Sequence, residues 1–390
     1  MKRSTERILV THQGTLPREP DLRELVVAKE EGGSYDETEL SGRLRRAVAQ
    51  LVDKQCKAGV DFVNDGEQSK SSFQYYARSR LGGHQDQPSK GSEPPPPLIT
   101  NKRDQLRFPG FFNREGAAGG RMSQGFRRRQ SFVTEPLRYI GHESVRVDID
   151  NLKAAVADKD VAGGVLMAVA PGTIEHWLHN EYYSSQEEFL FAVADAMHEE
   201  YKAITDSGLI VHIDDPDLAD GWQIYPDMQL SEYRRYAELR VEALNRALQG
   251  IPSENVILHV CWGSGHHPHV SDLPLRDLID LFLKVNALGI SIEAANPRHE
   301  WEWTVFEDVK LPDDKVLIPG VVGHASDIVE HPELIAQRLV RYANLVGREN
   351  VVGGTDCGLG SRVGHAEVAW AKLAAMADGA RIATKRLWSR

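Results

Sequence analysis

The sequence has few of the features that mark secreted or membrane proteins. It contains only three cysteines, Cys56, Cys261 and Cys357, an odd and sparse set that provides no disulfide framework. No run of about eighteen apolar residues occurs, and residues 1–13 contain no apolar stretch of signal-peptide length. We therefore expect a cytoplasmic protein that does not associate with membranes and that keeps its cysteines as thiols.

Positive charge is also in deficit. Lys and Arg number 46 against 57 Asp and Glu, so the formal net charge is −11. Broad contact with a phosphate backbone requires a basic surface. Nucleic acid is therefore not an expected partner.

The chain does contain enough apolar residues for a large core. Of its 390 residues 41% are hydrophobic and 26% are charged, as in packed globular proteins. Short β-rich runs alternate with helical patterns, which is typical of a parallel sheet with crossover helices. The expected strands are Arg7–Thr11, Asp61–Asn64, Gly164–Ala170, Leu209–Ile213, Val256–Val260, Ile290–Glu293, Val316–Pro319 and Asn350–Gly353. This pattern predicts an α/β fold, a TIM (β/α)8 barrel.

Helices are expected where apolar residues recur at steps of three and four. The periodicity is clearest in Gln186–Asp206, and similar stripes mark Leu275–Leu288, Pro332–Val346 and Ala366–Met376. Glycines that follow helical patterns are interpreted as helix ends, and they are Gly250, Gly289, Gly347 and Gly379. Apolar stripes face either a core or a second copy of the chain, so a homo-oligomer is left open.

One region interrupts this alternation. Residues 84–136 carry Pro94–Pro97, several glycines and the basic run Arg127–Arg129, with no clear periodicity. We interpret them as an insertion or lid within a single catalytic barrel domain that spans residues 1–390. The arginine run is most simply a solvated surface.

Four potential metal ligands lie at the ends of predicted strands. His259 and Cys261 are two residues apart on one strand, so both side chains point to the same face. Glu293 ends the next strand, and Cys357 follows a glycine-rich strand. One nitrogen, two sulfurs and one oxygen suit tetrahedral zinc. The alternative interpretation is two buried, apolar cysteines and a hydrogen-bonded histidine.

The charge of such a site suggests its chemistry. Zn²⁺ with two thiolates and one carboxylate carries a net charge of about −1, which makes it a weak Lewis acid but a good binder of thiolates. A zinc-bound substrate thiolate can attack an alkyl carbon. We therefore expect a transferase that acts on a small-molecule thiol and an alkyl or methyl donor. The alternative is a non-catalytic barrel in which structural zinc supports a binding function, and beyond zinc no cofactor is expected.

These residues resemble the cobalamin-independent methionine synthase superfamily. In that family a UROD/MetE-like barrel binds zinc through His, Cys, Glu and Cys in this chain order, which His259, Cys261, Glu293 and Cys357 match. The segment Thr355–Arg362 is similar to the family's last ligand motif. The overall length looks closer to single-barrel relatives that include epoxyalkane:coenzyme M transferase. The resemblance leaves open homocysteine or coenzyme M as the thiol, and a methyl donor, folate included, or an epoxide as the electrophile.

The resemblance also implies residues that bind the thiol substrate. Val211–Pro216 is similar to the family's substrate-amine strand, Thr11–Arg18 to its first loop and Asn64–Glu67 to its second acidic loop. The implied substrate-binding residues are Gly14, Thr15, Glu67 and Asp214.

One further histidine and one cluster of histidines are candidates for a role. His176 follows Pro171–Gly172 near the expected barrel mouth and is predicted to donate a proton, the alternative being an ordinary helix start. His266, His267 and His269 raise the question of a second metal, but histidines in a mouth loop are more typically solvated or substrate-facing.

Overall fold

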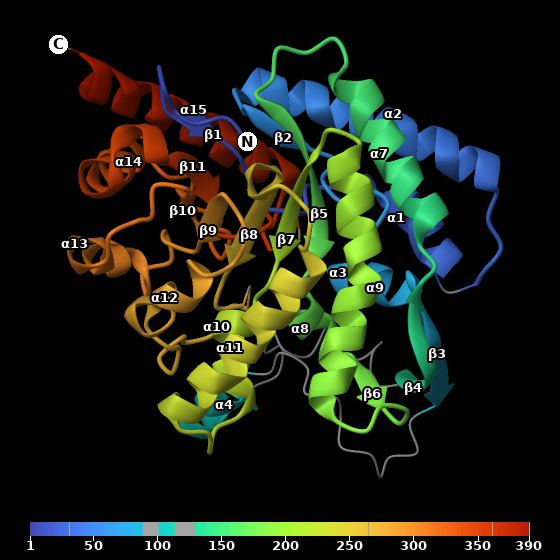
Figure 1. Ribbon diagram of the computed structural model, residues 1–390. Helices are drawn as coiled ribbons and strands as arrows, with labels where there is room; N and C mark the ends of the chain where they lie inside the picture. The colour runs from blue at the N-terminus through green and yellow to red at the C-terminus, as the bar shows by residue number, and fades with distance from the viewer. Residues whose placement is uncertain (31, 89–100, 114–128, 264, 361, 390) are drawn as a thin grey trace.

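A barrel of eight parallel strands forms the centre of the structure (Figure 1). The computed structural model describes residues 1–30, 32–88, 101–113, 129–263, 265–360 and 362–389. Around the barrel the strands follow the order β1-β11-β10-β9-β8-β7-β5-β2. Their bounds are β1 Leu9–Val10, β2 Phe62–Asn64, β5 Gly163–Val169, β7 Ile210–Asp214, β8 Val256–Val260, β9 Gly289–Ile292, β10 Val316–Val322 and β11 Val352–Thr355. All eight predicted strands are confirmed to within three residues at each end.

The barrel is brought to near closure by contacts between β1 and the start of β2. The backbone N–H of Asp61 donates to the carbonyl of Val10 at 3.0 Å. The Asp61 carboxylate in turn accepts the N–H of Val10 at 2.8 Å and is paired with Arg7. One aspartate therefore supplies the edge hydrogen bonds that a longer strand pair would otherwise make. The TIM-like fold expected from the alternation is confirmed.

Helices surround the barrel, and the apolar stripes in the sequence face it. The larger ones are α1 Pro20–Glu30, α2 Glu37–Ala58, α7 His142–Val156, α9 Gln186–Asp206, α11 Leu230–Ala247, α14 Pro332–Val346 and α15 Ala366–Trp388. In α9 the buried side chains include Phe189, Val193, Met197 and Tyr201, as the periodicity predicts. The Ser185 side chain accepts the N–H of Glu188 and so caps its first turn. The bounds of α9 and α14 are as expected.

The expected helix Leu275–Leu288 is wrong. The segment forms only η2 Leu275–Asp277 and α12 Ile279–Phe282. Further on, Asn245 of α11 accepts the N–H of Asn286 at 2.7 Å and donates to the carbonyl of Lys284 at 3.0 Å. These side-chain bonds occupy backbone groups that a continuous helix would use, so the helix does not continue.

The interpretation of Gly379 as a helix end is also wrong, because α15 runs through it to Trp388. A Cβ at Gly379 would lie 2.4 Å from Cγ2 of Ile335 in α14. The glycine is needed because the two helices pack too closely there for any side chain. By contrast, Gly347 does follow the end of α14, with a φ of +90°.

A small second sheet lies beside the barrel, in the order β3-β4-β6 (Figure 1). It comprises β3 Leu81–Pro88, β4 Arg129–Tyr139 and β6 Leu178–Asn180. Both ends of the expected insertion are therefore strands, which the missing periodicity did not predict. Gly83, with a φ of +99°, forms the bulge where the pairing of β3 and β4 shifts. Of the remaining insertion, residues 89–100 and 114–128, which include Pro94–Pro97 and Arg127–Arg128, lie outside the described residues.

Short helices follow several barrel strands. They include α3 Phe73–Ser79, α8 Pro171–Glu175 and α10 Asp217–Ile224, which lie with α4 Lys102–Arg107 at the lower end of the barrel in Figure 1. The other short elements are α5 Pro109–Phe112, α13 Val305–Asp308, η1 Ser253–Asn255, η3 Glu300–Thr304 and η4 Arg348–Asn350. This lower end is the carboxyl end of the strands, where barrels of this kind place their chemistry.

The barrel interior changes character along its axis. Around the amino ends of the strands the interior is apolar and forms a closed cluster that includes Phe62, Ile210, Ile257 and Val316. One step further along β7 and β8 the inward positions carry His212 and His259, and the centroids of their rings are 5.9 Å apart. The interior therefore consists of an apolar layer at the amino ends of the strands and a polar layer at their carboxyl ends.

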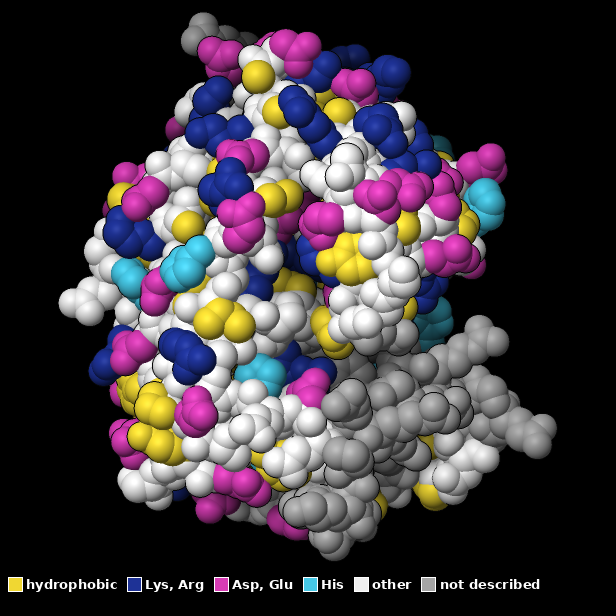
Figure 2. Space-filling view, turned by 90° about the vertical axis from the view of Figure 1, so that its right-hand side faces the viewer, with side chains coloured by type: hydrophobic (Ala, Val, Ile, Leu, Met, Phe, Trp, Pro, Cys, Tyr) yellow, Lys and Arg dark blue, Asp and Glu magenta, His cyan; other side chains and the backbone are white. Residues whose placement is uncertain are grey.

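The exterior carries charges of both signs. Figure 2 shows acidic and basic side chains interspersed over the face in view. No helix in the described ranges combines the length and apolar content needed to cross a membrane.

Candidate metal centre and substrate site

Three of the four predicted metal ligands meet at the carboxyl end of the barrel. His259 and Cys261, two positions apart at the end of β8, point to the same side as the strand alternation predicts. Cys357 joins them from the loop after β11, and one ligand atom from each of the three lies within 4.8 Å of the others. We call these residues the thiol trio. His259 and Cys261 are buried, whereas Cys357 is half-buried.

The donor atoms of the thiol trio suit a zinc ion. Nδ1 of His259 is bonded to Oγ of Ser291 at 3.0 Å, and its Nε2 has no partner among the described residues. Burial lowers the pKa of His259 to about 3, so its imidazole is neutral and able to ligate. A hydrogen bond to Cys357, together with burial, raises the pKa of the Cys261 thiol. One free imidazole nitrogen and two adjacent sulfurs are a donor set that Zn²⁺ favours.

Glu293 lies beside the thiol trio but belongs to a different group. Its Oε2 accepts the backbone N–H of Trp262 at 3.0 Å, and its Oε1 accepts the amide of Asn296 at 2.8 Å. It forms a group with His324 and Asp356, in which one atom from each of the three residues lies within 4.8 Å of the others. The four-residue metal centre predicted from the sequence is therefore formed in part, and ligation by Glu293 stays a prediction.

The sequence reasoning missed His324 and Asp356. Both ring nitrogens of His324 and Oδ2 of Asp356 lack partners within the described part of the chain. Burial lowers the pKa of His324 to about 4, whereas burial and the neighbouring Glu293 raise the pKa of Asp356. Both residues follow predicted strands, as the recognised ligands do, so their position was an available signal.

The residues implied to bind substrate fall into two places that face the thiol trio. Thr15 donates its hydroxyl to the Glu67 carboxylate, and a Cβ at Gly14 would lie 3.3 Å from Oε1 of Glu67. Gly14 and Glu67 have φ values of +47° and +55°, the left-handed region that is costly for a glutamate. Asp214, at the end of β7, is in register with His259.

Asp214 has an unpaired carboxylate oxygen. Its side chain is half-buried, but its Oδ1 is buried and has no hydrogen-bond partner in the ranges that the structure describes. Burial raises its pKa, and the charge of Glu67 raises it further. A buried carboxyl group of this kind favours a cationic partner that displaces its proton.

The loops that carry Cys357 and Thr15 are fixed against each other. The N–H of Gly360 donates to the carbonyl of Thr15 at 2.7 Å. A Cβ at Gly358 would lie 2.9 Å from the backbone nitrogen of Thr15, and one at Gly360 would lie 2.5 Å from the carbonyl carbon of Leu16. The glycines after Cys357 therefore permit the close approach that places a predicted metal ligand beside a predicted substrate residue.

His176 lies in a separate buried network. Its Nε2 is bonded to the Asp217 carboxylate and lies 2.9 Å from the Tyr236 hydroxyl. Arg240 bridges Asp217 and Glu175 at 2.6 and 2.9 Å. Burial opposes protonation of His176, but Asp217 outweighs it and the pKa is raised. The structure does not bring His176 together with the thiol trio, and its role as a proton donor stays a prediction.

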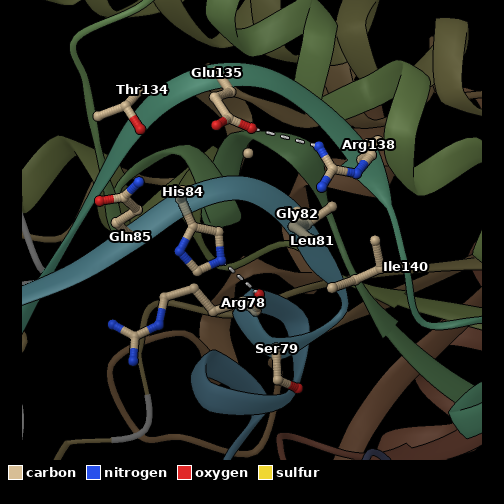
Figure 3. A pocket seen from close by; sticks show the side chains of 11 residues that line it. Arg78, Ser79, Leu81, Gly82, His84, Gln85, Thr134, Glu135, Arg138 and Ile140 are labelled. Carbon is tan, nitrogen blue, oxygen red and sulfur yellow. Dashed lines mark hydrogen bonds and ion pairs between the residues drawn. The ribbon is translucent and has the colours of Figure 1, made fainter.

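An open pocket of about 360 Å³ lies away from these groups, at the bulge of the second sheet (Figure 3). His84 and Arg78 line one side, and Glu135 pairs with Arg138 across it at 3.8 Å. None of the predicted metal or substrate residues lines this pocket. The candidate site is therefore the polar layer at the barrel's carboxyl end.

A TIM-like barrel with thiols, imidazoles and carboxylates converging at the carboxyl ends of its strands defines a class of barrel enzymes. Residues 128–382 match the model of the cobalamin-independent synthase catalytic domain, and the chain belongs to this family. The resemblance inferred from the sequence motifs is confirmed.

Individual relatives are distant but cover nearly the whole chain. The methionine synthase of Thermococcus kodakarensis is 25% identical over 370 residues, which is 94% of this chain and 89% of the relative. The methionine synthase of Saccharolobus solfataricus is 24% identical over 378 residues, with coverage of 96% and 94%. A B12-independent methionine synthase from Shewanella sp. W3-18-1, solved with selenomethionine, superimposes with a TM-score of 0.70 at 21% identity and covers 97% of this chain and 99% of its own.

Proposed function

We propose that this protein is a zinc-dependent methyltransferase that alkylates the sulfur of homocysteine. The observation that carries the proposal is the juxtaposition of the thiol trio with the unpaired carboxylate of Asp214, which is in register with His259. The first group provides a zinc site, and the second provides a site for a substrate cation. The names of the relatives, methionine synthases, agree with this combination.

The metal site is assigned to His259, Cys261 and Cys357, with Glu293 as the fourth ligand or as a ligand that gives way to substrate. When bound there, Zn²⁺ supplies a soft cation that lowers the pKa of a substrate thiol and keeps it as a nucleophilic thiolate. The Ser291 hydroxyl holds Nδ1 of His259 at 3.0 Å and so directs Nε2 toward the two sulfurs. The bonds from Trp262 and Asn296 orient Glu293.

The acidic groups favour an amino acid as the thiol substrate. Glu67 is close enough to Asp214 that its charge raises the pKa of Asp214, and no described cation is paired with Oδ1 of Asp214. A substrate ammonium group would satisfy this oxygen and stabilise both charges. Coenzyme M carries a sulfonate and no amine, so this site disfavours it. The backbone at Gly14 and Thr15 is then positioned to receive the substrate carboxylate.

The remaining alternative is a structural zinc in a binding protein. In a structural site four protein ligands close the coordination sphere. Here Cys357 is half-buried and Glu293 is held in another group, so an exchangeable position is retained. This observation favours catalysis over a structural role.

The test is metal content and thiol binding in matched cysteine variants. We expect Cys261→Ser and Cys357→Ser to lose the zinc bound at the thiol trio and to lose methyl transfer to homocysteine. Cys56→Ser, in α2 and outside the trio, serves as the control and should retain both. Full zinc and full activity in the first two variants would refute the assignment.

The thiol is identified by substituting Co²⁺ for zinc and adding thiols in turn. Homocysteine should shift the visible spectrum at lower concentration than 2-mercaptoethanesulfonate, because only homocysteine carries an amine. An equal response to both would contradict the role of Asp214, and no response to any thiol would indicate a closed, structural site.

A further inference from the structure

We propose a second metal site in this protein, for a divalent transition ion, formed by His269, Asp272 and His299. One ligand atom from each of these residues lies within 4.8 Å of the others, and all three residues are buried. We call this group the imidazole trio. It is separate from the thiol trio and contains no sulfur.

The two imidazoles converge on a single carboxylate oxygen. Nδ1 of His269 lies 2.6 Å from Oδ2 of Asp272, and Nε2 of His299 lies 3.1 Å from the same atom. Both nitrogens therefore face the same carboxylate oxygen, and the three ligand atoms lie close enough together for one ion to bind them. Two histidines and one carboxylate, with a further position for water, are a common set of ligands for zinc and for non-haem iron.

Each ligand is oriented by a further hydrogen bond on its far side. Nδ1 of His299 is bonded to Oε2 of Glu302 at 3.1 Å, and Nε2 of His269 is bonded to the carbonyl of Gly265 at 3.1 Å. Gln223 donates to the other Asp272 oxygen, Oδ1, at 2.7 Å. Metal-binding histidines usually donate their second nitrogen to a carboxylate or a backbone carbonyl, which fixes the tautomer and the ring. Both histidines here have that partner.

The backbone and the surroundings add two independent observations. His269 adopts a φ of +55°, which is uncommon for a residue other than glycine and is typical of positions held for function. Asp220, near Asp272, is fully buried, and neither of its carboxylate oxygens has a partner in the described ranges. A bound cation would balance this concentration of buried acidic groups.

Trp262 connects the imidazole trio to the candidate active site. Its ring stacks on His299 with centroids 4.0 Å apart and planes inclined by 19°, and its backbone N–H donates to Glu293. A metal at the imidazole trio would therefore hold the segment that orients Glu293. The competing explanation is a hydrogen-bonded network that holds the same segment without any ion.

The decisive measurement is zinc stoichiometry in variants that remove one site at a time. We expect two equivalents in the wild-type chain, one in the Cys261→Ser/Cys357→Ser variant, one in Asp272→Ala, and none when the three substitutions are combined. His266→Ala is the matched control, because His266 is exposed in the same loop and outside the imidazole trio. It should keep two equivalents.

A cobalt titration of the Cys261→Ser/Cys357→Ser variant keeps the test independent of whether Asp272→Ala folds. One equivalent of Co²⁺ should bind and give weak visible bands without the intense near-ultraviolet absorption of cobalt–thiolate bonds. A variant that binds no Co²⁺ overturns the proposal and leaves the hydrogen-bonded network. Loss of metal only from the imidazole trio, with the cysteine variants equal to wild type, would instead refute the proposed thiol site.

The second hydrogen bond of His299 gives a graded test. Glu302→Gln should weaken zinc at the imidazole trio about 10- to 100-fold, as substitutions at such supporting positions do. The affinity is measured by competition with a chelator in the variant that lacks the two cysteines. An unchanged affinity would show that Glu302 does not support a metal ligand and would overturn the site as described.

Discussion

The two layers of the barrel interior differ in almost every physical property. The apolar layer, which includes Phe62, Ile210, Ile257 and Val316, is buried, and its side chains form one hydrophobic cluster. The polar layer carries His212, Asp214 and His259, each with at least one polar atom that has no partner in the described chain. Such a buried group costs about 1–3 kcal/mol of folding free energy when it has no hydrogen bond.

This difference indicates a division of work within one closed sheet. The apolar layer stabilises the barrel, because burying large apolar side chains removes their surface from water. The polar layer reduces the stability of the fold and is retained where an external ligand can supply the missing hydrogen-bond or metal partners. The proposed zinc and the proposed substrate ammonium are such partners.

The largest effect is expected when either of the two thiols is replaced. Cys261→Ser and Cys357→Ser should each lower kcat/KM by about 10³-fold or more, since losing a metal removes several kcal/mol of transition-state stabilisation. Steady-state kinetics with homocysteine and a methyl donor measure the loss. Unfolding of the metal-free forms by urea should show little change from wild type. A large loss of stability would mean that the cysteines support the fold, as the side chains of the apolar layer do.

A substitution in the apolar layer should have the opposite effect, with a loss of stability and no loss of metal. Phe62 is fully buried in the apolar cluster, so Phe62→Ala should reduce the free energy of unfolding by about 3–5 kcal/mol. Leu106→Ala, at a side chain that is 67% exposed, is the control and should change stability by less than about 0.5 kcal/mol. Urea denaturation gives both values. The distinction between the layers fails if the folded Phe62→Ala chain has lost its metal.

Asp214→Asn sharpens the comparison, because it removes the carboxylate that would pair with a substrate ammonium in the polar layer and changes the shape of the side chain little. KM for homocysteine should rise about 10- to 100-fold, which corresponds to the loss of one charge-assisted hydrogen bond. Zinc content should not change. A thiol without an amine, such as 2-mercaptoethanesulfonate, serves as the control substrate, and its KM should be the same in both enzymes. An equal rise for both thiols would exclude an ammonium contact.

A pH dependence of stability is expected at Asp215, whose pKa burial raises to about 7. The folded chain keeps this carboxyl protonated to about pH 7, whereas the unfolded chain loses the proton near the usual value of 3.8. Folding is therefore penalised progressively as the pH rises from about 4 to 7, and the penalty is full above pH 7. Asp215→Asn removes the penalty while its side-chain oxygen can still accept the Thr173 hydroxyl.

The measurement compares urea unfolding at pH 5 and pH 8. The stability of Asp215→Asn relative to wild type should increase from the lower to the higher pH. Asp227→Asn, at an exposed position, is the control and should show no such trend. A decrease at pH 8 would mean that Asp215 is ionised and paired in the folded protein.

Much of the fold follows from the sequence pattern. The eight strands and the helices α9 and α14 were predicted because period-two and period-3.6 patterns reflect which face of an element is buried. His259 and Cys261 were predicted to share a face for the same reason, and the structure brings them together with Cys357. The failures at Leu275–Leu288 and Gly379 share a different cause. In both, a neighbouring helix decided the local structure, through Asn245 of α11 and Ile335 of α14.

The site was less predictable because its partners come from distant parts of the chain. Ligation by Glu293 stays a prediction, and the sequence did not indicate that the N–H of Trp262 and the amide of Asn296 bind it or that it groups with His324 and Asp356. The imidazole trio likewise depends on His299, which lies 27 positions beyond Asp272. No spacing rule within one strand or helix reports such contacts.

The sequence by itself determined which elements form, which face of each is buried, and which ligand types stand at the strand ends, because these depend on contacts within a few residues. The tertiary structure alone decided which donor atoms meet and which find partners elsewhere. That outcome depends on how the closed barrel aligns the ends of its strands, and a difference of a few ångströms there separates a metal ligand from a hydrogen-bonded carboxylate.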